Sequence, residues 1–249
     1  MTKLRGISHF SYSSNEQPTY AALSATMTFD KSNRLVTYNG QAVQYDADGN
    51  MTSGPPMGVT TNFAYDARNR LISAGNTSYG YDAENNRIAV ITDGQQTSYV
   101  INLQTKLSQL LIKTDAKGNN TYYIYGLGLI GQEEADGTYK TYHFDNRGST
   151  TSITDIQGAV TDTFAYAPFG ELIQRTGTTD TPFLYDGRDG VMTDSNGLYY
   201  MRARYYNPDI KRFINQDVLE GKRNNVSNQC NGQNCNMGIR EYCGSCGLC

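Results

Sequence analysis

Residues 63–90 read FAYDARNRLISAGNTSYGYDAENNRIAV and contain the same short motif twice. Each copy begins with a Tyr-Asp pair and has asparagine three residues after the aspartate, at Asp66–Asn69 and Asp82–Asn85. Aspartate favours the first position of a type I turn, where its carboxylate can accept from the backbone two residues on. The fourth position often needs a left-handed backbone, which asparagine tolerates and glycine adopts freely. This stretch therefore predicts two tight turns separated by short strands.

The same turn motif, Asp-x-x-(Gly or Asn), occurs eight times along the chain. The first four aspartates are 16, 20 and 16 residues apart. Such a spacing holds two strands of about 5–6 residues and two turns, so each unit predicts one β-hairpin. After the turn comes a polar or basic residue and then an aliphatic one, as in Arg34-Leu35, Asn50-Met51, Arg70-Leu71 and Arg87-Ile88. The eight turns are Asp30–Asn33, Asp46–Gly49, Asp66–Asn69, Asp82–Asn85, Asp115–Gly118, Asp145–Gly148, Asp155–Gly158 and Asp194–Gly197.

The composition supports many short strands joined by turns. The 249 residues include 20 Tyr and 25 Gly but no Trp, and 18% are charged. Tyr and Thr suit a half-buried pleated surface, so we predict an all-β fold of consecutive antiparallel hairpins. The formal net charge of -3 gives no electrostatic footprint for nucleic acid or an anionic membrane surface. We also predict no membrane span, no cofactor and, because Met1–Tyr12 lacks an apolar stretch, no signal peptide in this chain.

Three segments interrupt or obscure the strand pattern. Leucines in Asn102–Lys113 have spacing compatible with a helix, but no capping signal precedes them, and we predict a strand. Gly54–Gly58, which reads GPPMG, cannot be a central strand. Thr176–Thr181 is a polar loop. Neither Gly54–Gly58 nor Thr176–Thr181 is long enough to predict a domain boundary.

Two later stretches carry a longer and more specific pattern. Gly197–Pro208 reads GLYYMRARYYNP and is followed by Arg212-Phe213, while Tyr142–Glu171 reads YHFDNRGSTTSITDIQGAVTDTFAYAPFGE. Together with the Tyr-Asp pairs at 45–46, 65–66 and 81–82, they resemble the YD repeats and the repeat-associated core of the RHS family. The residues that carry the core resemblance are Tyr199, Tyr200, Arg202, Arg204, Tyr205, Tyr206, Pro208, Arg212 and Phe213.

The resemblance implies a fold, a division of the chain and a role. Related proteins wind a β-sheet into a spiralling, hollow shell whose core segment closes one end, and a variable C-terminal region, often a toxin, lies inside or beyond it. The chain would then form a partial β-shell, with a longer shell or a toxin cargo as its partners, and would be secreted or at the cell surface. We expect residues 1–23 to be an edge segment, 24–141 the hairpins, 142–221 the core, and 222–249 a Cys-rich, disordered or truncated tail.

The sequence departs from the self-cleaving members of the family. In those proteins an Asp-Pro-x-Gly element follows the Arg-Phe pair and a second one ends the core. Asp217 stands where the first aspartate is expected, but Val218 follows it in place of proline, and the second element is missing. We therefore predict that the chain is not an enzyme and treat Asp217 only as a remnant of the cleavage motif.

Other functional interpretations of single residues are weaker than structural ones. Asp46–Asn50 begins like a calcium loop, but Met51 and Met57 occupy the positions where such a loop needs Gly and Glu. His143 lies on a predicted strand without a nucleophile motif, and we expect a structural role. The three core arginines could form an anion site, but stacking between Arg and Tyr on the strands is favoured.

The last twenty residues contain all five cysteines. Cys243, Cys246 and Cys249 have the spacing of two that suits zinc, but such tight spacing leaves little room for two ligand pairs. The preceding Asn224–Asn236 is rich in Asn, Gln and Gly, and we expect disorder there rather than a metal site. The rival to a shell role is a cell-surface adhesion or carbohydrate-binding module that would bind glycans or proteins through exposed tyrosines.

Overall fold

A computed structural model describes residues 9–11, 19–21 and 25–216 of the chain. The first two of these segments are the strands β1 (His9–Ser11) and β2 (Thr19–Ala21), which pair with each other. No helix in the described residues is long and apolar enough to cross a membrane. The description below concerns residues 25–216, which belong to one compact unit.

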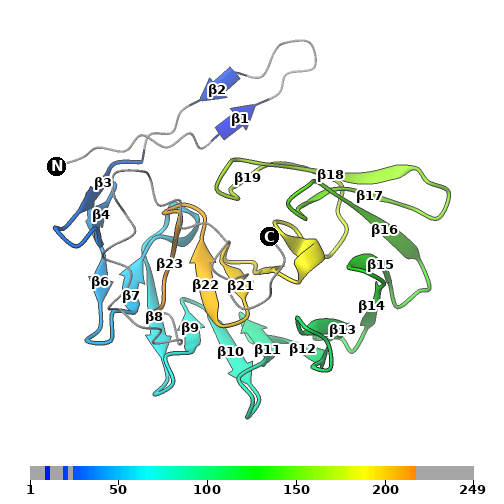
Figure 1. The fold of residues 1–249 in the computed structure, drawn as a ribbon, viewed down its shortest axis with the longest axis horizontal. Coiled ribbons are helices and arrows are strands. Elements are labelled where there is room, and N and C mark those ends of the chain that lie inside the picture. The colour runs from blue at the N-terminus through cyan, green and yellow to red at the C-terminus, as the bar shows by residue number, and fades with distance from the viewer. Residues whose placement is uncertain (1–8, 12–18, 22–24, 217–249) are drawn as a thin grey trace. The chain divides into compact units, whose positions relative to one another are not determined.

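The described chain first forms a long antiparallel meander, which we call the wall. Strands next to each other in the sequence pair within a three-stranded sheet, β3 to β5, and within a fourteen-stranded sheet, β6 to β19 (Figure 1). The predicted all-β fold of consecutive antiparallel hairpins is confirmed. The strands of the wall are β3 (Met27–Phe29), β4 (Leu35–Tyr38), β5 (Gln41–Ala42), β6 (Gln44–Tyr45), β7 (Met51–Gly54), β8 (Thr61–Tyr65), β9 (Leu71–Ala74), β10 (Thr77–Tyr81), β11 (Arg87–Thr92), β12 (Gln95–Asn102), β13 (Gln109–Thr114), β14 (Asn120–Tyr125), β15 (Leu129–Glu133), β16 (Tyr139–Phe144), β17 (Thr150–Thr154), β18 (Val160–Tyr166) and β19 (Leu172–Thr176).

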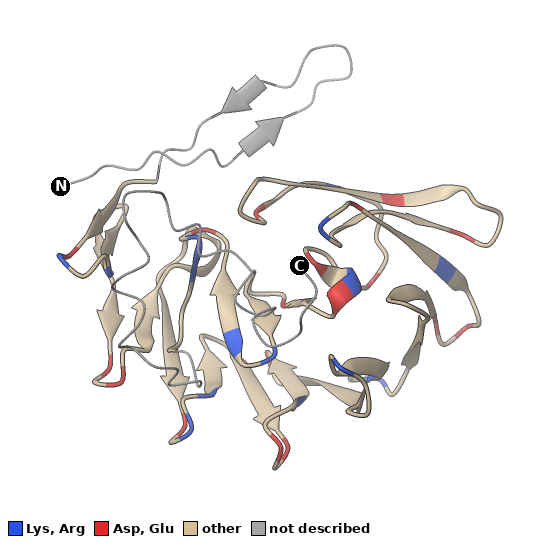
Figure 2. Ribbon diagram, viewed as in Figure 1, with Lys and Arg blue, Asp and Glu red and all other residues tan. Residues whose placement is uncertain are grey.

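The turn chemistry follows from the aspartate and from the residue three positions later. In the turn Asp66–Asn69, the Asp66 carboxylate accepts from the backbone N–H of Arg68 at 2.9 Å and of Arg70 at 3.0 Å. Asn69 has a φ of 58°, in the left-handed region. Figure 2 shows that many of the acidic and basic residues lie at such turns. All eight Asp-x-x-(Gly or Asn) motifs have a positive φ at their last residue, namely Asn33, Gly49, Asn69, Asn85, Gly118, Gly148, Gly158 and Gly197.

Two further turns have the same geometry without aspartate at the first position. Gly137 donates to the carbonyl of Glu134, and Gly170 donates to the carbonyl of Ala167, each at 2.9 Å. Both glycines have a positive φ, 82° and 92°. They fall outside the Asp-x-x-(Gly or Asn) pattern because their first residue is not aspartate, although the first position of a type I turn accepts many residues.

The segment Asn102–Lys113 is a strand only at its two ends. Strand β12 ends at Asn102 and β13 begins at Gln109, so the prediction of one continuous strand is wrong for residues 103–108. Local hydrogen bonds replace the ladder there: Asn102 accepts from the backbone N–H of Gln104, and the Thr105 hydroxyl donates to the carbonyl of Leu107. Side-chain bonds of this kind compete with sheet pairing. The other two interruptions appear as expected, a short 3-10 helix η1 (Pro56–Gly58) and a loop that follows β19.

After the wall, residues 182–216 form a second layer, which we call the core segment. It contains a 3-10 helix η2 (Gly187–Asp189) and a four-stranded sheet of β20 (Met192–Thr193), β21 (Tyr199–Met201), β22 (Arg204–Asn207) and β23 (Arg212–Phe213). The wall continues without a break through residue 142, where the resemblance would start a separate core. Figure 1 shows the wall bending around β21 and β22.

The hydrophobic core lies between the inner face of the wall and the core segment. Most wall strands contribute one or two buried residues to it, and Leu71 and Ile153 have no exposed surface. Leu198 and Ile214 of the core segment are buried in the same cluster. Burial of apolar surface, worth about 25 cal/mol per Å², therefore joins two layers that are far apart in sequence.

Candidate functional site: the joint between wall and core segment

The most deeply buried charge of the described residues is Arg87, the first residue of β11. Its guanidinium donates to the Asp194 carboxylate at 2.6 Å, and both side chains are almost completely buried. Four tyrosine rings surround the guanidinium carbon at 4.2–5.8 Å, those of Tyr79 and Tyr99 from the wall and of Tyr200 and Tyr205 from the core segment. Arg87 therefore joins the two layers by an ion pair and by cation–π contacts.

The pKa values of Arg87 and Asp194 depend both on burial and on the charge of the other member of the pair. Burial alone would lower the pKa of Arg87, but the Asp194 carboxylate together with Tyr205 and Tyr99 raises it, so the guanidinium stays charged. Burial likewise raises the pKa of Asp194, against the pull of Arg87. Nε of Arg87 has no hydrogen-bond partner among the described residues. Removing one member of such a pair leaves an uncompensated buried charge, which typically costs about 3–5 kcal/mol.

A comparison of the residues that follow Asp82 with those that follow Asp66 explains why the Arg87 side chain points inward. In the turn Asp82–Asn85 it is Asn86, rather than Arg87, that takes the place of Arg70, because the Asn86 backbone N–H and side chain both bond to Asp82. Arg87 then stands where the buried Leu71 stands one repeat earlier. The predicted pair Arg87-Ile88 was out of register by one residue, and Ile88 is exposed. The sequence therefore contained a signal for this site: Arg87, a charged residue, stands at a position that the repeat pattern directs inward.

The tyrosines of the YD pairs connect one repeat to the one before it. The hydroxyl of Tyr45 donates to the carbonyl of Leu35 at 2.9 Å, and that of Tyr81 donates to Leu71 at 2.7 Å. The hydroxyl of Tyr65 instead reaches across the layers and donates to the carbonyl of Ile214 at 3.2 Å. These polar ends allow large aromatic side chains to be buried without losing a hydrogen bond.

The structure does not bring the three core arginines together. Arg204 lies over the Phe213 ring at 3.7 Å, and Arg212 lies over the Phe29 ring at 4.8 Å. Arg202 has a left-handed backbone, with a φ of 58°, and donates to the side chain and the carbonyl of Ser108. Arg202 and Arg212 therefore contact different parts of the wall, Arg204 packs within the core segment, and no shared anion site results.

Two further tyrosines of the core motif also contact the wall. The hydroxyl of Tyr199 donates to the carbonyl of Gly170, and that of Tyr206 donates to the carbonyl of Phe169 at 3.0 Å. The carbonyl of Pro208 accepts from the backbone of Lys211 in the turn before β23.

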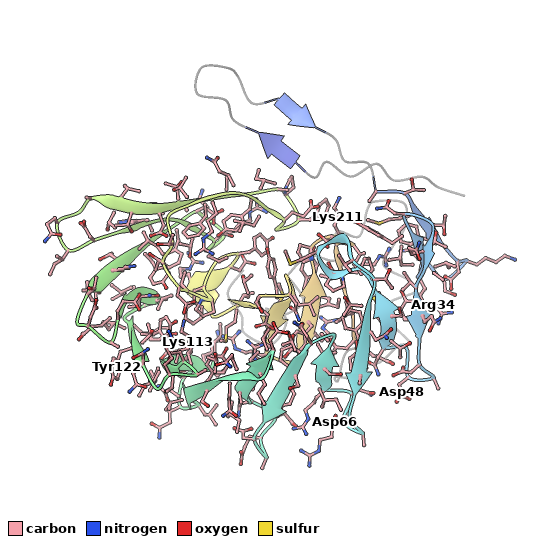
Figure 3. All side chains as sticks on the ribbon, turned by 180° about the vertical axis from the view of Figure 1, so that it is seen from behind. Arg34, Asp48, Asp66, Lys113, Tyr122 and Lys211 are labelled. Carbon is pink, nitrogen blue, oxygen red and sulfur yellow. The ribbon has the colours of Figure 1, made fainter. Side chains whose placement is uncertain are left out.

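Lys211 and Arg212 form what we call the clasp, because they contact both ends of the wall. The ammonium of Lys211 lies 5.2 Å from the Phe169 ring, in the turn between β18 and β19. Arg212 contacts Phe29 of β3 and donates to Asn33 at 3.1 Å. Figure 3 labels Lys211 on the core segment. The clasp thus connects the first and last hairpins of the wall.

A comparison with protein families identifies the chain. The family model of the teneurin YD-shell matches residues 3–238. The chain belongs to the teneurin YD-shell family. This YD-shell chain is 36% identical over 104 residues to salivary gland surface protein 1 of Aedes aegypti, covering 40% of this chain and 3% of that protein. It is 39% identical over 83 residues to double-stranded DNA deaminase toxin A of Burkholderia cenocepacia (strain H111), covering 31% of this chain and 6% of the toxin.

Solved structures show the same architecture. The TcdB2-TccC3-Cdc42 crystal structure superposes with a TM-score of 0.59 at 16% identity, covering 84% of this chain and 12% of that chain. At this identity the likeness concerns the fold. The YD-shell chain spans only a small part of each of these larger proteins. The family and the fold together support the role of a shell segment.

The other candidate residues give no chemical site in the described structure. Nε2 of His143 lies 3.0 Å from the Thr154 hydroxyl, on an exposed part of the sheet. In residues 25–216 no group of three or more His, Cys, Asp or Glu side chains could hold a metal ion. Asp217, Cys243, Cys246 and Cys249 lie outside the described residues, so the interpretations of these positions stay predictions.

Proposed function

We propose that this chain is the C-terminal part of the wall of a longer YD shell, and that the complete shell encloses or presents a C-terminal toxin or effector. The observation that carries the proposal is the joint itself. The chain covers the inner face of its own wall with residues 182–216 and fixes them there with a buried ion pair. A segment held inside a curved wall is suited to closing one end of a container.

Two further observations support this role. Strands β3 and β19 are the outer strands of the described meander. Each has one edge without a paired strand in the described sheets, and strands of a longer shell could pair with these edges. The backbone N–H of Gln216, the last described residue, donates to Asn50 at 2.9 Å, so the chain leaves the core segment beside β7 of the wall. The toxin among the relatives indicates the kind of cargo that could follow. As part of such a protein, the chain would be secreted or exposed at the cell surface.

The test uses the complete protein that carries this segment. We expect limited trypsin digestion of the native protein to leave the region after Gln216 intact at protease concentrations that degrade it once the shell is opened by urea. Mass spectrometry of the fragments gives the protected boundary. Equal cleavage rates for this region in the native and urea-opened protein would contradict enclosure.

The rival function is adhesion or carbohydrate binding through tyrosines. The tyrosines of residues 25–216 are buried or half-buried with one exception, Tyr122, which is 43% exposed. Saturable binding of the chain to an array of immobilised sugars, lost on Tyr122→Ala substitution, would favour this rival. The shell role proposed above includes no self-cleavage, so we expect an intact-mass measurement to show a single uncut species.

A further inference from the structure

Residues 183–190 make the closest backbone contact between the core segment and the second half of the wall. The carbonyls of Leu184 and Phe183 accept from the backbone and the hydroxyl of Thr150, at 2.9 and 2.7 Å. The Arg188 N–H donates to the carbonyl of Gly148 at 3.0 Å. At Gly187 an added Cβ would lie only 2.9 Å from the Phe183 side chain. The two layers therefore meet here through direct hydrogen bonds, and Gly187 leaves little room for a larger side chain.

Asp186 lies at the centre of this contact with an incomplete set of partners. The residue is 4% exposed and has a left-handed backbone, with a φ of 50°. The Ser149 hydroxyl lies 3.3 Å from one carboxyl oxygen, while the other oxygen, Oδ2, has no hydrogen-bond partner among the described residues. An ionised carboxylate has about four acceptor positions, so a single hydroxyl donor leaves most of its lost hydration uncompensated.

The charges around Asp186 do not supply the missing stabilisation. Burial raises its pKa to about 6; the bond from Ser149 lowers the pKa, the nearby carboxylates of Asp189 and Asp145 raise it, and Arg147 lowers it. The charged and titratable groups that interact with Asp186 are Asp145, Arg147 and Tyr166 of the wall and Tyr185, Arg188, Asp189 and Tyr206 of the core segment.

We propose that Asp186 makes this joint responsive to protons: the contact of residues 183–190 with the wall is tight while the carboxyl is neutral and loosens when it becomes charged. A neutral carboxyl needs no counter-ion and loses far less hydration on burial than a carboxylate does. Because the pKa in the closed state lies above that of an exposed aspartate, the closed joint binds the proton more tightly. Its stability is therefore greatest in acid and is lost as the pH rises through about 6.

Hydrogen exchange in the intact chain tests this proposal. Amide protection of residues 183–190, corrected for intrinsic exchange, should fall by about tenfold between pH 5 and pH 8, as expected for a pKa near 6 in the closed joint and an ordinary aspartate in the open one. The Asp186→Asn variant has a neutral amide at a backbone conformation that asparagine tolerates, and its protection should not change over this pH range. A flat profile in the unsubstituted chain, or the same slope in both proteins, would overturn the proposal.

Two further variants separate a proton response from a structural role. Asp189→Asn removes a repelling carboxylate and should move the midpoint of the protection profile to lower pH, with residues 183–190 still closed in acid. Ser149→Ala removes the hydroxyl donor to the carboxylate and should move the midpoint to higher pH. If Asp186→Asn does not fold, these two shifts still decide the matter, because unchanged midpoints in both variants would reject a titrating Asp186.

Discussion

At the scale of single residues, the joint depends on one position where the repeat pattern is broken. Arg87 occupies an inward position that other repeats fill with Leu35, Met51 or Leu71. A guanidinium there is tolerated because Asp194 neutralises it and tyrosine rings surround it. Its partner is 107 residues away in the sequence, so the ion pair couples the two layers directly.

Arg87→Met should be strongly destabilising. The substitution leaves the Asp194 carboxylate buried without its cation, and we expect a loss of about 3–5 kcal/mol in the free energy of unfolding. The matched control is Arg70→Met, because Arg70 pairs with Asp66 at a partly exposed turn and should cost about 0–1 kcal/mol. Urea unfolding followed by circular dichroism measures both values.

The double variant Arg87→Met, Asp194→Asn distinguishes pairing from packing. Because the second substitution removes the charge that the first leaves unpaired, the double variant should lose less stability than Arg87→Met alone. Additive losses would show that the two side chains act independently.

The sequence could predict the turns but not this site. Asp-x-x-(Gly or Asn) is a local code, since the carboxylate and the left-handed corner lie within four residues. The Arg87 site needs residues from β10, β11, β12 and the core segment, and no local pattern brings them together. The sequence does show that Asn86 stands four residues after Asp82, as Arg70 does after Asp66, and this register identifies Arg87 as an inward residue.

At the scale of elements, each hairpin is defined by a corner that few residues can occupy. Gly158 closes the turn between β17 and β18 with a φ of 82°, and an added Cβ would meet no atom within 4 Å. A substitution there therefore measures backbone strain without steric clash. At Gly197, by contrast, an added Cβ would lie 2.6 Å from the Met57 side chain.

Gly158→Ala should lower the free energy of unfolding by about 1–2 kcal/mol, because an L side chain disfavours the left-handed region. Gly158→Asn should cost less, since asparagine occupies this corner in three of the other turns, at Asn33, Asn69 and Asn85. Thermal unfolding of the two variants gives the comparison. Equal losses for alanine and asparagine would mean that the corner does not select for the left-handed conformation.

At the scale of the whole described unit, the wall depends on the core segment to hold its two ends. The clasp of Lys211 and Arg212 connects β3 with the turn between β18 and β19, although these elements are far apart along the meander. The inner face of the wall is apolar, so the core segment and the clasp together determine how much of that face water can reach.

Replacing both clasp residues by alanine should loosen the ends of the wall selectively. We expect faster amide exchange at β3, β4 and residues 167–170, with little change around Arg87, which is held by other contacts. Lys31→Ala, in the exposed turn before Asn33, is the control and should leave exchange unchanged. Uniform acceleration throughout the wall would show that the clasp has no separate role.

The unpaired outer sides of β3 and β19 predict association of the isolated chain. Such edges present free backbone donors and acceptors to other strands. We expect oligomers in multi-angle light scattering, with the proportion rising with concentration. A monomer with cooperative unfolding would contradict this expectation.

The position of the core segment at the end of the described chain has a consequence for synthesis. Neighbouring hairpins of the wall pair locally and can form as soon as they leave the ribosome, whereas the contact of Arg87 with Asp194 must wait for 107 further residues. During this interval the leucines and tyrosines of the inner wall have nothing to cover them. Nascent chains that pause near Thr176 should therefore be the species most in need of a chaperone.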